Sequence, residues 1–366
     1  MSRQSELAEL SRIYDSSALS NRNIITNGGM QISQRGSTFT APNAAYTLDR
    51  YQVYQANGAV FDIKTSTDAP DGFESSLEID CTTAAASPAA GAYFQMLQRI
   101  EGYNVQQLAY GTSSAKKITL SFYVKSNKTG TYQVNFRRST ATAQMANKTY
   151  TINSADTWER KSVTVDGATG FSLTGGNAEG LMVDWWYHSG SDFTSGSGSE
   201  TYIALASTNY NANGTANLGD NTSNYLRMTG VQLEVGDTAT PFEHRSYGDE
   251  FQKCLRYYEQ WNCVGGENIW LGTTYSGDGS CFPQFHVIKR AAPTITLPAA
   301  GQSSGQISFL NGTGGYPTTT GTHSVDKVTT RGYRLSGSGY SGLTSSTPTV
   351  LYASSGTEIF KYDAEL

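Results

Sequence analysis

Residues 118–136 contain the pattern that most narrows the choice of fold for this chain. Apolar and polar residues alternate on both sides of the turn-forming sequence SNKTG. The alternating apolar residues are Ile118, Leu120, Phe122 and Val124 before the turn, and Tyr132, Val134 and Phe136 after it. Successive side chains of a β-strand point to opposite faces, so each segment has one apolar face to bury. The pattern therefore predicts two short strands joined by a turn.

The same alternation recurs across residues 24–245, for example in TWERKSVTV and NYLRMTGVQLEV. The composition agrees with it, because 38 glycines and runs of serine, threonine and asparagine supply turns, while 23 tyrosines suit a pleated surface. Many short strands separated by turns predict an antiparallel β-sandwich of the jelly-roll type for residues 24–245. Further strand-like segments, including QISFL and TEIFKY, predict a C-terminal β-domain at 262–366.

Two short segments of this mainly β chain have helical periodicity. Near the N-terminus, Leu7, Leu10 and Ile13 recur at helical spacing. A helix this short is only marginally stable alone. Residues 1–23 are therefore predicted to form a helical anchor that packs against another subunit or another protein.

The second helical segment, PFEHRSYGDEFQKCLRYYEQW, lies between the two predicted β-domains. Its apolar face, at positions i, i+3, i+4 and i+7, consists of Phe251, Cys254, Leu255 and Tyr258. Asp249 is the candidate N-cap residue. We expect a connecting amphipathic helix over 246–261 that docks on the β-sandwich.

Charge and composition argue against several classes of protein. The formal net charge is −5 and no basic run is present, so nucleic-acid binding is not expected. No stretch approaches the roughly 18 apolar residues that a membrane-spanning helix needs. The polar N-terminus lacks the apolar core of a signal peptide, so we expect the protein to be made in a cytoplasm rather than secreted through a cleaved signal.

The four cysteines and four histidines do not have the spacing of a metal site. The cysteines are scattered, which predicts buried thiols rather than a zinc or redox site. Asp220 and Asn221 offer oxygen ligands for a structural Ca²⁺, although the segment lacks the ligand spacing of an EF-hand. No other cofactor is expected.

Five motifs occur in this order along the chain: NGGMQISQRGSTFT, ITLSFYVKSNKTGTYQVNF, DTWERKSVTV, LRMTGVQLEVG and PFEHRSYGDEFQKCLRYYEQ. Together they resemble the tail-fibre and other fibrous structural proteins of tailed bacteriophages. The resemblance extends over about residues 24–300 as scattered motifs. It implies a jelly-roll domain similar to carbohydrate-binding modules.

The resemblance also implies a virion protein that is assembled in the host cytoplasm as a homotrimer. Its N-terminal anchor, with Leu7, Leu10 and Ile13, would attach to other virion proteins in the tail or the portal region. A distal part would bind host cell-surface polysaccharide. A tail fibre is the leading interpretation; a head fibre or capsid decoration protein is the alternative location, and a polysaccharide-degrading tailspike is the alternative activity.

The sequence does not pair any residues for catalysis. Glycoside hydrolysis usually needs two carboxylates about 5–10 Å apart. The candidates are Asp156, Glu159, Asp166 and Asp184, and their positions in the sequence do not establish a pair. The serine-rich stretches lack a G-x-S-x-G elbow with a strand and a helix around it. We therefore expect a binding or structural protein that is not an enzyme.

The segment LMVDWWYHSG contains the candidate sugar-binding residues. Strand alternation predicts one apolar core face, made of Leu181, Val183, Trp185 and Tyr187. The opposite face carries Asp184, Trp186 and His188. This set suits a pyranose, whose CH face stacks on an aromatic ring and whose hydroxyls need donors and acceptors. Alternatively, this face packs on a neighbouring subunit or domain, with Asp184 and His188 paired to each other.

The C-terminal domain offers a competing surface for receptor contact. Its candidate residues, in or near glycine-rich loops, are Tyr316, Tyr333 and Tyr340.

Overall fold

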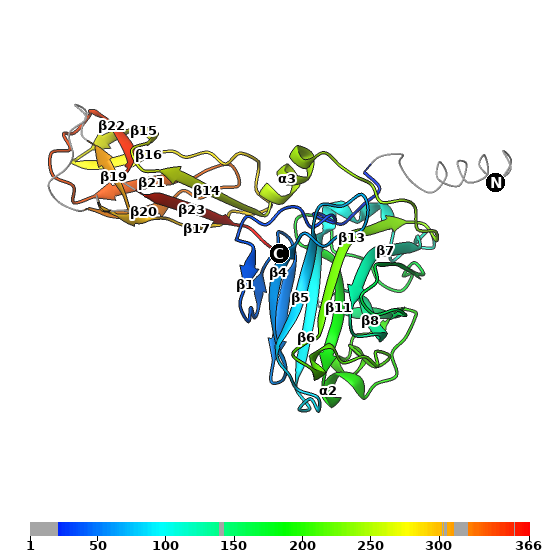
Figure 1. The fold of residues 1–366 in the computed structure, drawn as a ribbon. Helices are drawn as coiled ribbons and strands as arrows, with labels where there is room; N and C mark the ends of the chain where they lie inside the picture. Colours follow the sequence, from blue (N-terminus) through cyan, green and yellow to red (C-terminus); the bar gives the residue numbers. More distant parts are fainter. Residues whose placement is uncertain (1–20, 139–142, 302, 304–305, 311–320, 355) are drawn as a thin grey trace. The chain divides into compact units, whose positions relative to one another are not determined.

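The structure of the chain, a computed structural model, describes residues 21–138, 143–301, 303, 306–310, 321–354 and 356–366 (Figure 1). The chain divides into two compact units. The N-terminal unit runs to Phe251 and includes Leu366, and the C-terminal unit comprises residues 252–365. Both are built mainly from antiparallel sheets, so the predicted mainly β architecture is confirmed. The predicted N-terminal helix lies outside the described residues.

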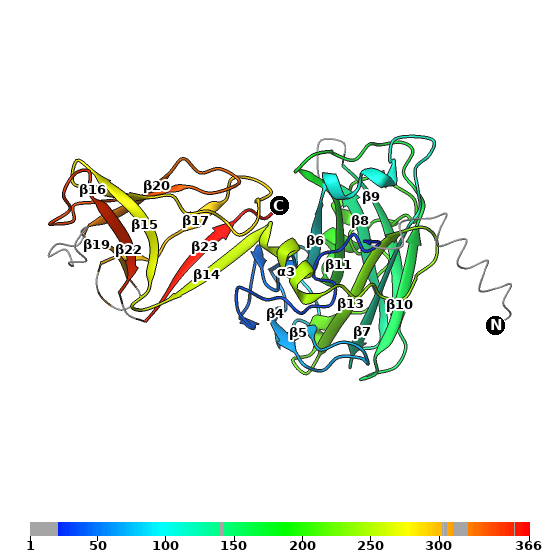
Figure 2. The ribbon, with the colours of Figure 1, turned by 90° about the horizontal axis from the view of Figure 1, so that it is seen from above.

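The N-terminal unit is a β-sandwich. One sheet has six strands in the order β1 (Thr38–Phe39), β4 (Val60–Ser66), β5 (Ser76–Thr83), β13 (Tyr225–Val235), β7 (Ile118–Ser126) and β10 (Glu159–Val165). The other has seven, in the order β12 (Ile203–Ala204), β9 (Gln144–Ile152), β8 (Gly130–Arg138), β11 (Glu179–Ser189), β6 (Tyr93–Glu101), β3 (Gln52–Ala56) and β2 (Ala45–Tyr46). Figure 2 shows the two sheets as facing layers.

The turn after β7 carries the chain from one layer to the other. β7 pairs with β13 and β10 in the six-stranded sheet, whereas β8 pairs with β9 and β11 in the seven-stranded sheet. The Asn127 side chain fixes this crossing, because its Nδ2 donates to the Ser223 carbonyl at 2.9 Å and its Oδ1 accepts from the Tyr225 N–H at 3.0 Å. The two strands predicted within residues 118–136 are confirmed, and they lie in opposite layers.

The core of the N-terminal unit lies between the sheets. Phe122 on β7 meets Tyr150 on β9 with 4.9 Å between ring centroids, and Trp185 on β11 with 6.0 Å. The predicted core face of β11 is confirmed, since Leu181, Val183, Trp185 and Tyr187 are all wholly buried. Burying an apolar side chain of this size contributes about 1.5–3 kcal/mol.

The expected connecting helix is shorter than its apolar pattern predicts. Helix α3 spans Tyr247–Leu255, and Tyr258 is already the first residue of strand β14 (Tyr258–Val264). The predicted N-cap is also corrected. The Ser246 hydroxyl accepts from the Asp249 N–H at 3.2 Å and donates to the Asp249 carboxylate at 2.6 Å, so Ser246 is the cap and Asp249 occupies the third helical position. No helix of the described residues is long and apolar enough to span a membrane.

The C-terminal unit contains two further sheets. The three-stranded sheet has the order β14, β23 (Thr357–Asp363) and β17 (Thr294–Thr296). The seven-stranded sheet has the order β18 (Ala299–Ala300), β19 (Gln306–Leu310), β22 (Pro348–Ala353), β15 (Asn268–Tyr275), β16 (Asp278–Cys281), β21 (Arg334–Ser338) and β20 (Thr322–Asp326). Aromatic pairs such as Phe285 with Tyr362, 4.9 Å apart, contribute much of its core.

Candidate functional site

The candidate sugar-binding residues lie on β11, at the centre of the seven-stranded sheet of the N-terminal unit. Strand register sets their neighbours on the outer face, the side of this sheet that faces away from the core. One row across this face contains Tyr54, Gln95, Trp186 and Gln133. The adjacent row contains Gln52, Leu97, Asp184, Asn135 and Asn147. The outer face thus places amides, an indole and a carboxylate side by side.

Residues 190–216 of the same chain are here named the cover segment. Residues around Tyr210 lie over β8, β9 and β11, whereas strand β12 of the segment extends the sheet beside β9. The cover segment contains α2 (Ser191–Thr194), β12 and the 3₁₀ turn η3 (Ser207–Asn209). Gln133 Nε2 donates to the carbonyls of Asn209 at 2.9 Å and Tyr210 at 2.8 Å. Asn135 Nδ2 donates to the same Tyr210 carbonyl at 2.9 Å, and Gln133 Oε1 accepts from the Asn213 N–H at 2.8 Å. These amides therefore bond to the chain's own backbone.

The cover segment buries Trp186 and Asp184. Trp186 is 1% exposed and stacks on Tyr210 with 5.1 Å between ring centroids. Its indole N–H donates to the Asp184 carboxylate at 2.6 Å, and the other carboxylate oxygen lies 3.2 Å from Nε of Arg137. The expectation that these two residues present an open sugar-binding face is therefore wrong. The face packs on the chain's own cover segment, rather than on a neighbouring subunit or domain.

His188 does not share a face with Asp184 and Trp186, because a β-bulge shifts the register between Trp186 and His188. Trp186 is opposite Gln95, but His188 is opposite Phe94, a core residue. A bulge of one residue sends the following side chain to the other face. The predicted grouping of these three residues, and the alternative pairing of Asp184 with His188, are both corrected by this bulge.

The His188 imidazole has structural partners instead. Its Nε2 accepts from the Ala59 N–H at 3.2 Å, so Nδ1 carries the proton and donates to Asn217 Oδ1 at 2.7 Å. Gly58 leaves space for the ring, since a Cβ at that position would lie 2.4 Å from Nε2. Burial lowers the pKa of His188, against the opposing effect of the Asn217 hydrogen bond, so the neutral ring is favoured.

Two of the three candidate tyrosines in the C-terminal unit are buried. Tyr333 is 3% exposed, and its hydroxyl lies 3.2 Å from that of Tyr362. Tyr340 is 6% exposed and its hydroxyl lies 2.5 Å from Nε2 of His323. Their rings fill the core of the unit, so they are not available as receptor-contacting side chains. Tyr316, like Leu7, Leu10 and Ile13, lies outside the described residues.

Part of the outer face remains open beside the cover segment, on β3 and β6. We name it the open strip and define it by four half-buried residues, Tyr54, Tyr93, Gln95 and Arg99. Tyr54 and Gln95 are direct cross-strand neighbours. Arg99 is held by an ion pair to Glu179 at 3.0 Å, and its guanidinium carbon lies 5.9 Å from the centre of the Tyr54 ring. The strip thus combines aromatic rings with fixed hydrogen-bonding groups.

Sequence reasoning missed the open strip, although one pattern could have revealed it. In QVYQA, Val53 is the core residue, so alternation sends Tyr54 outward together with Gln52. An aromatic residue at a position expected to be polar is a candidate for stacking on a sugar, as Trp186 was. What the sequence could not show is which part of the face stays open.

The carboxylates weighed for catalysis are engaged in other contacts. Asp166 pairs with Lys117 at 2.9 Å, and Asp156 accepts from the Tyr225 hydroxyl at 2.5 Å. Partial burial of Glu159 acts to raise the pKa of its carboxyl group. Hydrogen bonds from Lys161 and from backbone N–H groups outweigh this effect and lower the pKa of Glu159 to about 2. A carboxylic acid that is to protonate a leaving group needs a raised pKa instead.

The proposed cation ligands have protein partners too. Asp220 accepts hydrogen bonds from Lys128 and from Asn224, the latter at 2.6 Å. Within the part of the chain that the structure describes, no three histidine, cysteine or acidic residues are grouped so that they could hold a metal ion. All four cysteines are buried and free of disulfides, as expected of structural thiols.

Comparisons with solved structures give distant similarities. The enzymatically active domain of tailspike protein 4 of bacteriophage CBA120 matches with a TM-score of 0.33 at 14% identity, over 59% of this chain and 22% of that one. A CBM4 structure matches with 0.31 at 16%, over 58% and 99% of the two chains. The family 11 carbohydrate-binding module of a Clostridium thermocellum cellulosomal cellulase matches with 0.29 at 11%, over 55% and 96%.

This chain therefore spans about a fifth of the tailspike domain's length. No protein-family model matches the sequence, and neither does any curated protein.

Proposed function

We propose that this protein is a virion fibre protein that binds host cell-surface polysaccharide through the open strip, without cleaving it. The observation that carries this proposal is the open strip itself. It is the part of the outer face where Tyr54, Tyr93, Gln95 and Arg99 are only half-buried, at the edge of the cover segment, whose Phe193 ring lies 5.3 Å from that of Tyr93.

The chemistry of the open strip suits a sugar. The Tyr54 and Tyr93 rings can stack on the CH face of a pyranose. The Gln95 amide offers two N–H donors to hydroxyls, and its oxygen, which accepts from Arg137 at 3.3 Å, keeps a second lone pair.

Arg99 adds N–H donors only, and its guanidinium is oriented by Glu179, Gln52 and the Tyr54 hydroxyl, which all accept from it. Because the side chains stand on paired strands, the sheet holds them in place before a ligand arrives, which lowers the entropic cost of binding.

The virion role is supported by the ordered motifs, which resemble those of phage tail fibres. In this proposal the chain forms a homotrimer, residues 1–23 attach it to other tail proteins, and assembly takes place in the host cytoplasm. A place in the tail is preferred to one on the head. Virions labelled with an antibody to this chain would show the two locations directly in micrographs.

The proposed lack of catalysis is supported by the state of the candidate carboxylates. Asp156, Asp166 and Asp184 are each bonded to a neighbouring side chain, and Glu159 has a lowered pKa. Release of reducing ends or unsaturated sugars from host polysaccharide by the purified protein would instead identify a depolymerase.

The binding test uses polysaccharide extracted from susceptible host cells and titration calorimetry on the full-length protein. Tyr54→Ala should weaken binding about tenfold, since loss of one ring stack costs up to about 1.5 kcal/mol. Tyr103→Ala is the matched control, because Tyr103 is 58% exposed and does not belong to the open strip. Equal affinity of the parent and Tyr54→Ala would reject the open strip as the site.

A further inference from the structure

A groove on the N-terminal unit, separate from the open strip, has a lining suited to a sugar. It has a volume of about 510 Å³. Tyr247 and Phe251 of α3 form one wall. Much of the rest is lined by hydroxyl side chains, namely Ser33, Ser37, Thr65, Ser66, Thr67 and Ser75. We name this feature the hydroxyl groove.

Several of these hydroxyls already donate their protons to backbone carbonyls. The bonds run from Ser75 Oγ to Met30 at 2.8 Å, from Thr65 Oγ1 to Ser37 at 3.4 Å, and from Ser33 Oγ to Gly36. A hydroxyl has one proton to donate and two lone pairs that accept. These side chains are therefore left as acceptors, and a ligand that binds them must bring hydrogen-bond donors.

The aromatic wall supplies the complementary apolar contact. Tyr247 and Phe251 are four residues apart on α3, so their rings lie on one side of the helix. The rings are nearly parallel, at 10°, with 5.9 Å between centroids, and Tyr247 is 59% exposed. Of the described residues that line the groove, none is charged. A neutral ligand with an apolar face and several hydroxyl donors meets all of these conditions.

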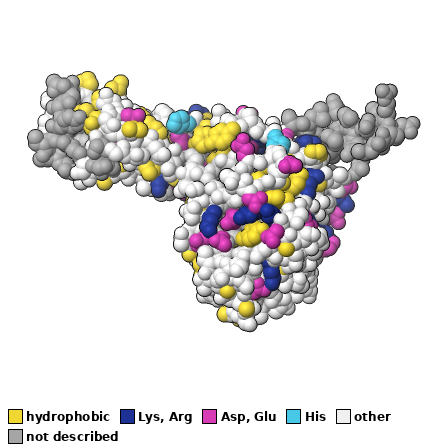
Figure 3. All heavy atoms as spheres, in the orientation of Figure 1, with side chains coloured by type: hydrophobic (Ala, Val, Ile, Leu, Met, Phe, Trp, Pro, Cys, Tyr) yellow, Lys and Arg dark blue, Asp and Glu magenta, His cyan; other side chains and the backbone are white. Residues whose placement is uncertain are grey.

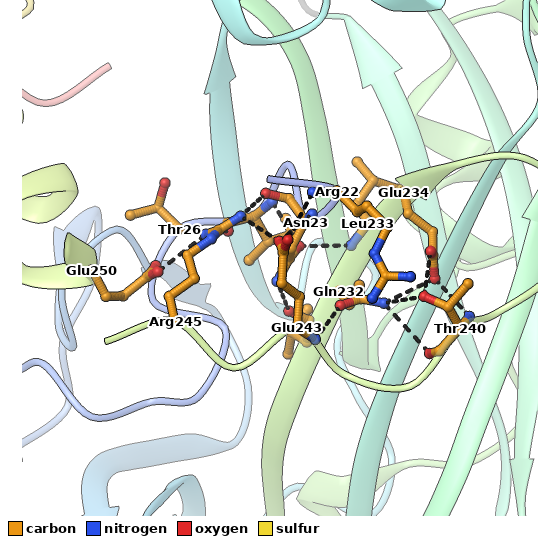
Figure 4. A network of polar contacts seen from close by, with 12 residues as sticks. Arg22, Asn23, Thr26, Gln232, Leu233, Glu234, Thr240, Glu243, Arg245 and Glu250 are labelled. Atoms are coloured by element: carbon orange, nitrogen blue, oxygen red, sulfur yellow. Dashed lines mark hydrogen bonds and ion pairs between the residues drawn. The ribbon is translucent and has the colours of Figure 1, made fainter. Parts of the chain in front are cut away.

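The start of α3 is held in place by a network of polar contacts (Figure 4). The Glu250 carboxylate accepts from the Asn27 N–H and pairs with Arg245 at 3.0 Å. Arg245 also pairs with Glu243 at 3.2 Å, and Glu243 accepts from the Asn23 N–H at 3.0 Å. These contacts tie the beginning of the helix to residues 22–27, so the aromatic wall is fixed before any ligand binds.

We propose that the hydroxyl groove is a second saccharide site, selective for an uncharged sugar residue. The ring of the sugar stacks on Tyr247, and its hydroxyls donate to the Ser and Thr oxygens opposite. This proposal rests on the proposed glycan-binding function, but it assigns binding to residues that the open strip does not contain.

Saturation-transfer NMR on the full-length protein tests the groove. The probes are the methyl glycosides of glucose, galactose, mannose and rhamnose, with glucuronic acid as the charged comparison and the peptide Gly-Leu-Gly as the non-sugar comparison. Transfer to the ring protons of at least one neutral glycoside is expected in the parent protein. In Tyr247→Ala it should fall about fivefold, since one ring stack is lost. Ser37→Phe, which fills the groove with an aromatic side chain, should have a similar effect.

The remaining variants separate this proposal from the proposed function. Tyr103→Ala should keep the parent signal with the neutral glycosides. Because Tyr54→Ala removes any contribution of the open strip to that signal, Tyr247→Ala and Ser37→Phe are also compared in the Tyr54→Ala background. Three results would each overturn the groove proposal. The first is no transfer to any of the four glycosides, and the second is transfer in Tyr247→Ala and Ser37→Phe equal to that in the parent protein. The third is transfer to Gly-Leu-Gly or glucuronic acid as strong as that to the glycosides. If Tyr54→Ala loses host polysaccharide while the groove variants match the parent, the groove proposal fails and the proposed function stands.

Discussion

The two units of this chain differ in how many large apolar side chains they leave exposed. Among the described residues, eight large hydrophobic side chains are exposed, and only Tyr103 and Tyr247 belong to the N-terminal unit. The six in the smaller C-terminal unit are Val264, Leu271, Tyr275, Phe282, Ile288 and Ile359. The N-terminal unit closes much of an exposed sheet face with its own cover segment. The C-terminal unit leaves apolar side chains that a partner can bury.

Strand β15 of the C-terminal unit illustrates the difference. Leu271 is 81% exposed and Tyr275 is 80% exposed, and both point to the same face of the strand. β15 is paired on both sides, with β16 and β22, so a partner cannot add a strand there and must pack on the face. Exposed apolar patches of this kind often mark protein interfaces. We expect this face to pack on other copies of the chain in the proposed homotrimer.

On the surface view of Figure 3, acidic and basic side chains are interspersed over the N-terminal unit rather than gathered by sign. The face drawn in this view shows no basic patch of the kind that nucleic-acid binding would call for.

The largest expected effect is in the N-terminal core. Trp185→Ala should lower the free energy of unfolding of that unit by about 3–5 kcal/mol, because a wholly buried indole is replaced by a cavity. Hydrogen exchange on peptides from each unit should show faster exchange in the N-terminal unit alone. Equal acceleration in both units would show that they do not unfold separately. Tyr103→Ala is the control, with little change.

Acid should lower the stability of the C-terminal unit because of His323. Burial lowers the pKa of His323 to about 4 from an ordinary 6.5. The unfolded chain therefore takes up a proton before the folded one does, and stability falls as the pH drops from about 6.5 to about 4. A loss of about 3 kcal/mol is expected over this window. In His323→Gln, denaturant unfolding of this unit should have a smaller pH dependence there; an unchanged dependence would contradict the assignment to His323.

The cover segment can be loosened by one substitution. Tyr210→Ala removes the ring that stacks on Trp186 and lies 4.9 Å from the Arg137 guanidinium, so we expect a loss of about 1–2 kcal/mol. Tryptophan fluorescence should shift to longer wavelength as Trp186 meets water. A fluorescence spectrum identical to that of the parent would show that other contacts of the cover keep Trp186 buried.

The smallest expected effect concerns assembly. Leu271→Asn should weaken self-association about tenfold if copies meet on the β15 face, because an apolar contact of this size contributes about 1–2 kcal/mol. Light scattering over a concentration series measures the shift towards monomer. Thr273→Asn, one alternate position along on the same exposed face, is the polar control. A monomeric parent protein at micromolar concentration would reject the homotrimer.

The sequence predicts the sheets of this chain better than its site, for a physical reason. Period-two alternation follows from the backbone, so it correctly placed Leu181, Val183, Trp185 and Tyr187 in the core. A bulge breaks that period without a marker in the sequence, which is why His188 was placed on the wrong face.

The sequence also did not predict that the cover segment packs on the sheet. Residues 190–216 are rich in glycine, serine and asparagine and have the composition of a surface loop. Their attachment depends on backbone carbonyls, such as that of Tyr210, which any residue type provides. Whether a polar sheet face binds a ligand or binds its own loop is therefore decided by tertiary structure.

The most direct test of the central claim is to locate bound polysaccharide on the full-length protein by hydrogen exchange. We predict slower exchange, on addition of host polysaccharide, in peptides that contain residues 52–56 and 93–99 of the open strip. Hydrogen exchange in peptides from β15 and β16 should change only as much as self-association changes it. A series of protein concentrations without polysaccharide measures that contribution. Protection confined to the C-terminal unit, with none in β3 or β6, would contradict the assignment of glycan binding to the N-terminal sandwich.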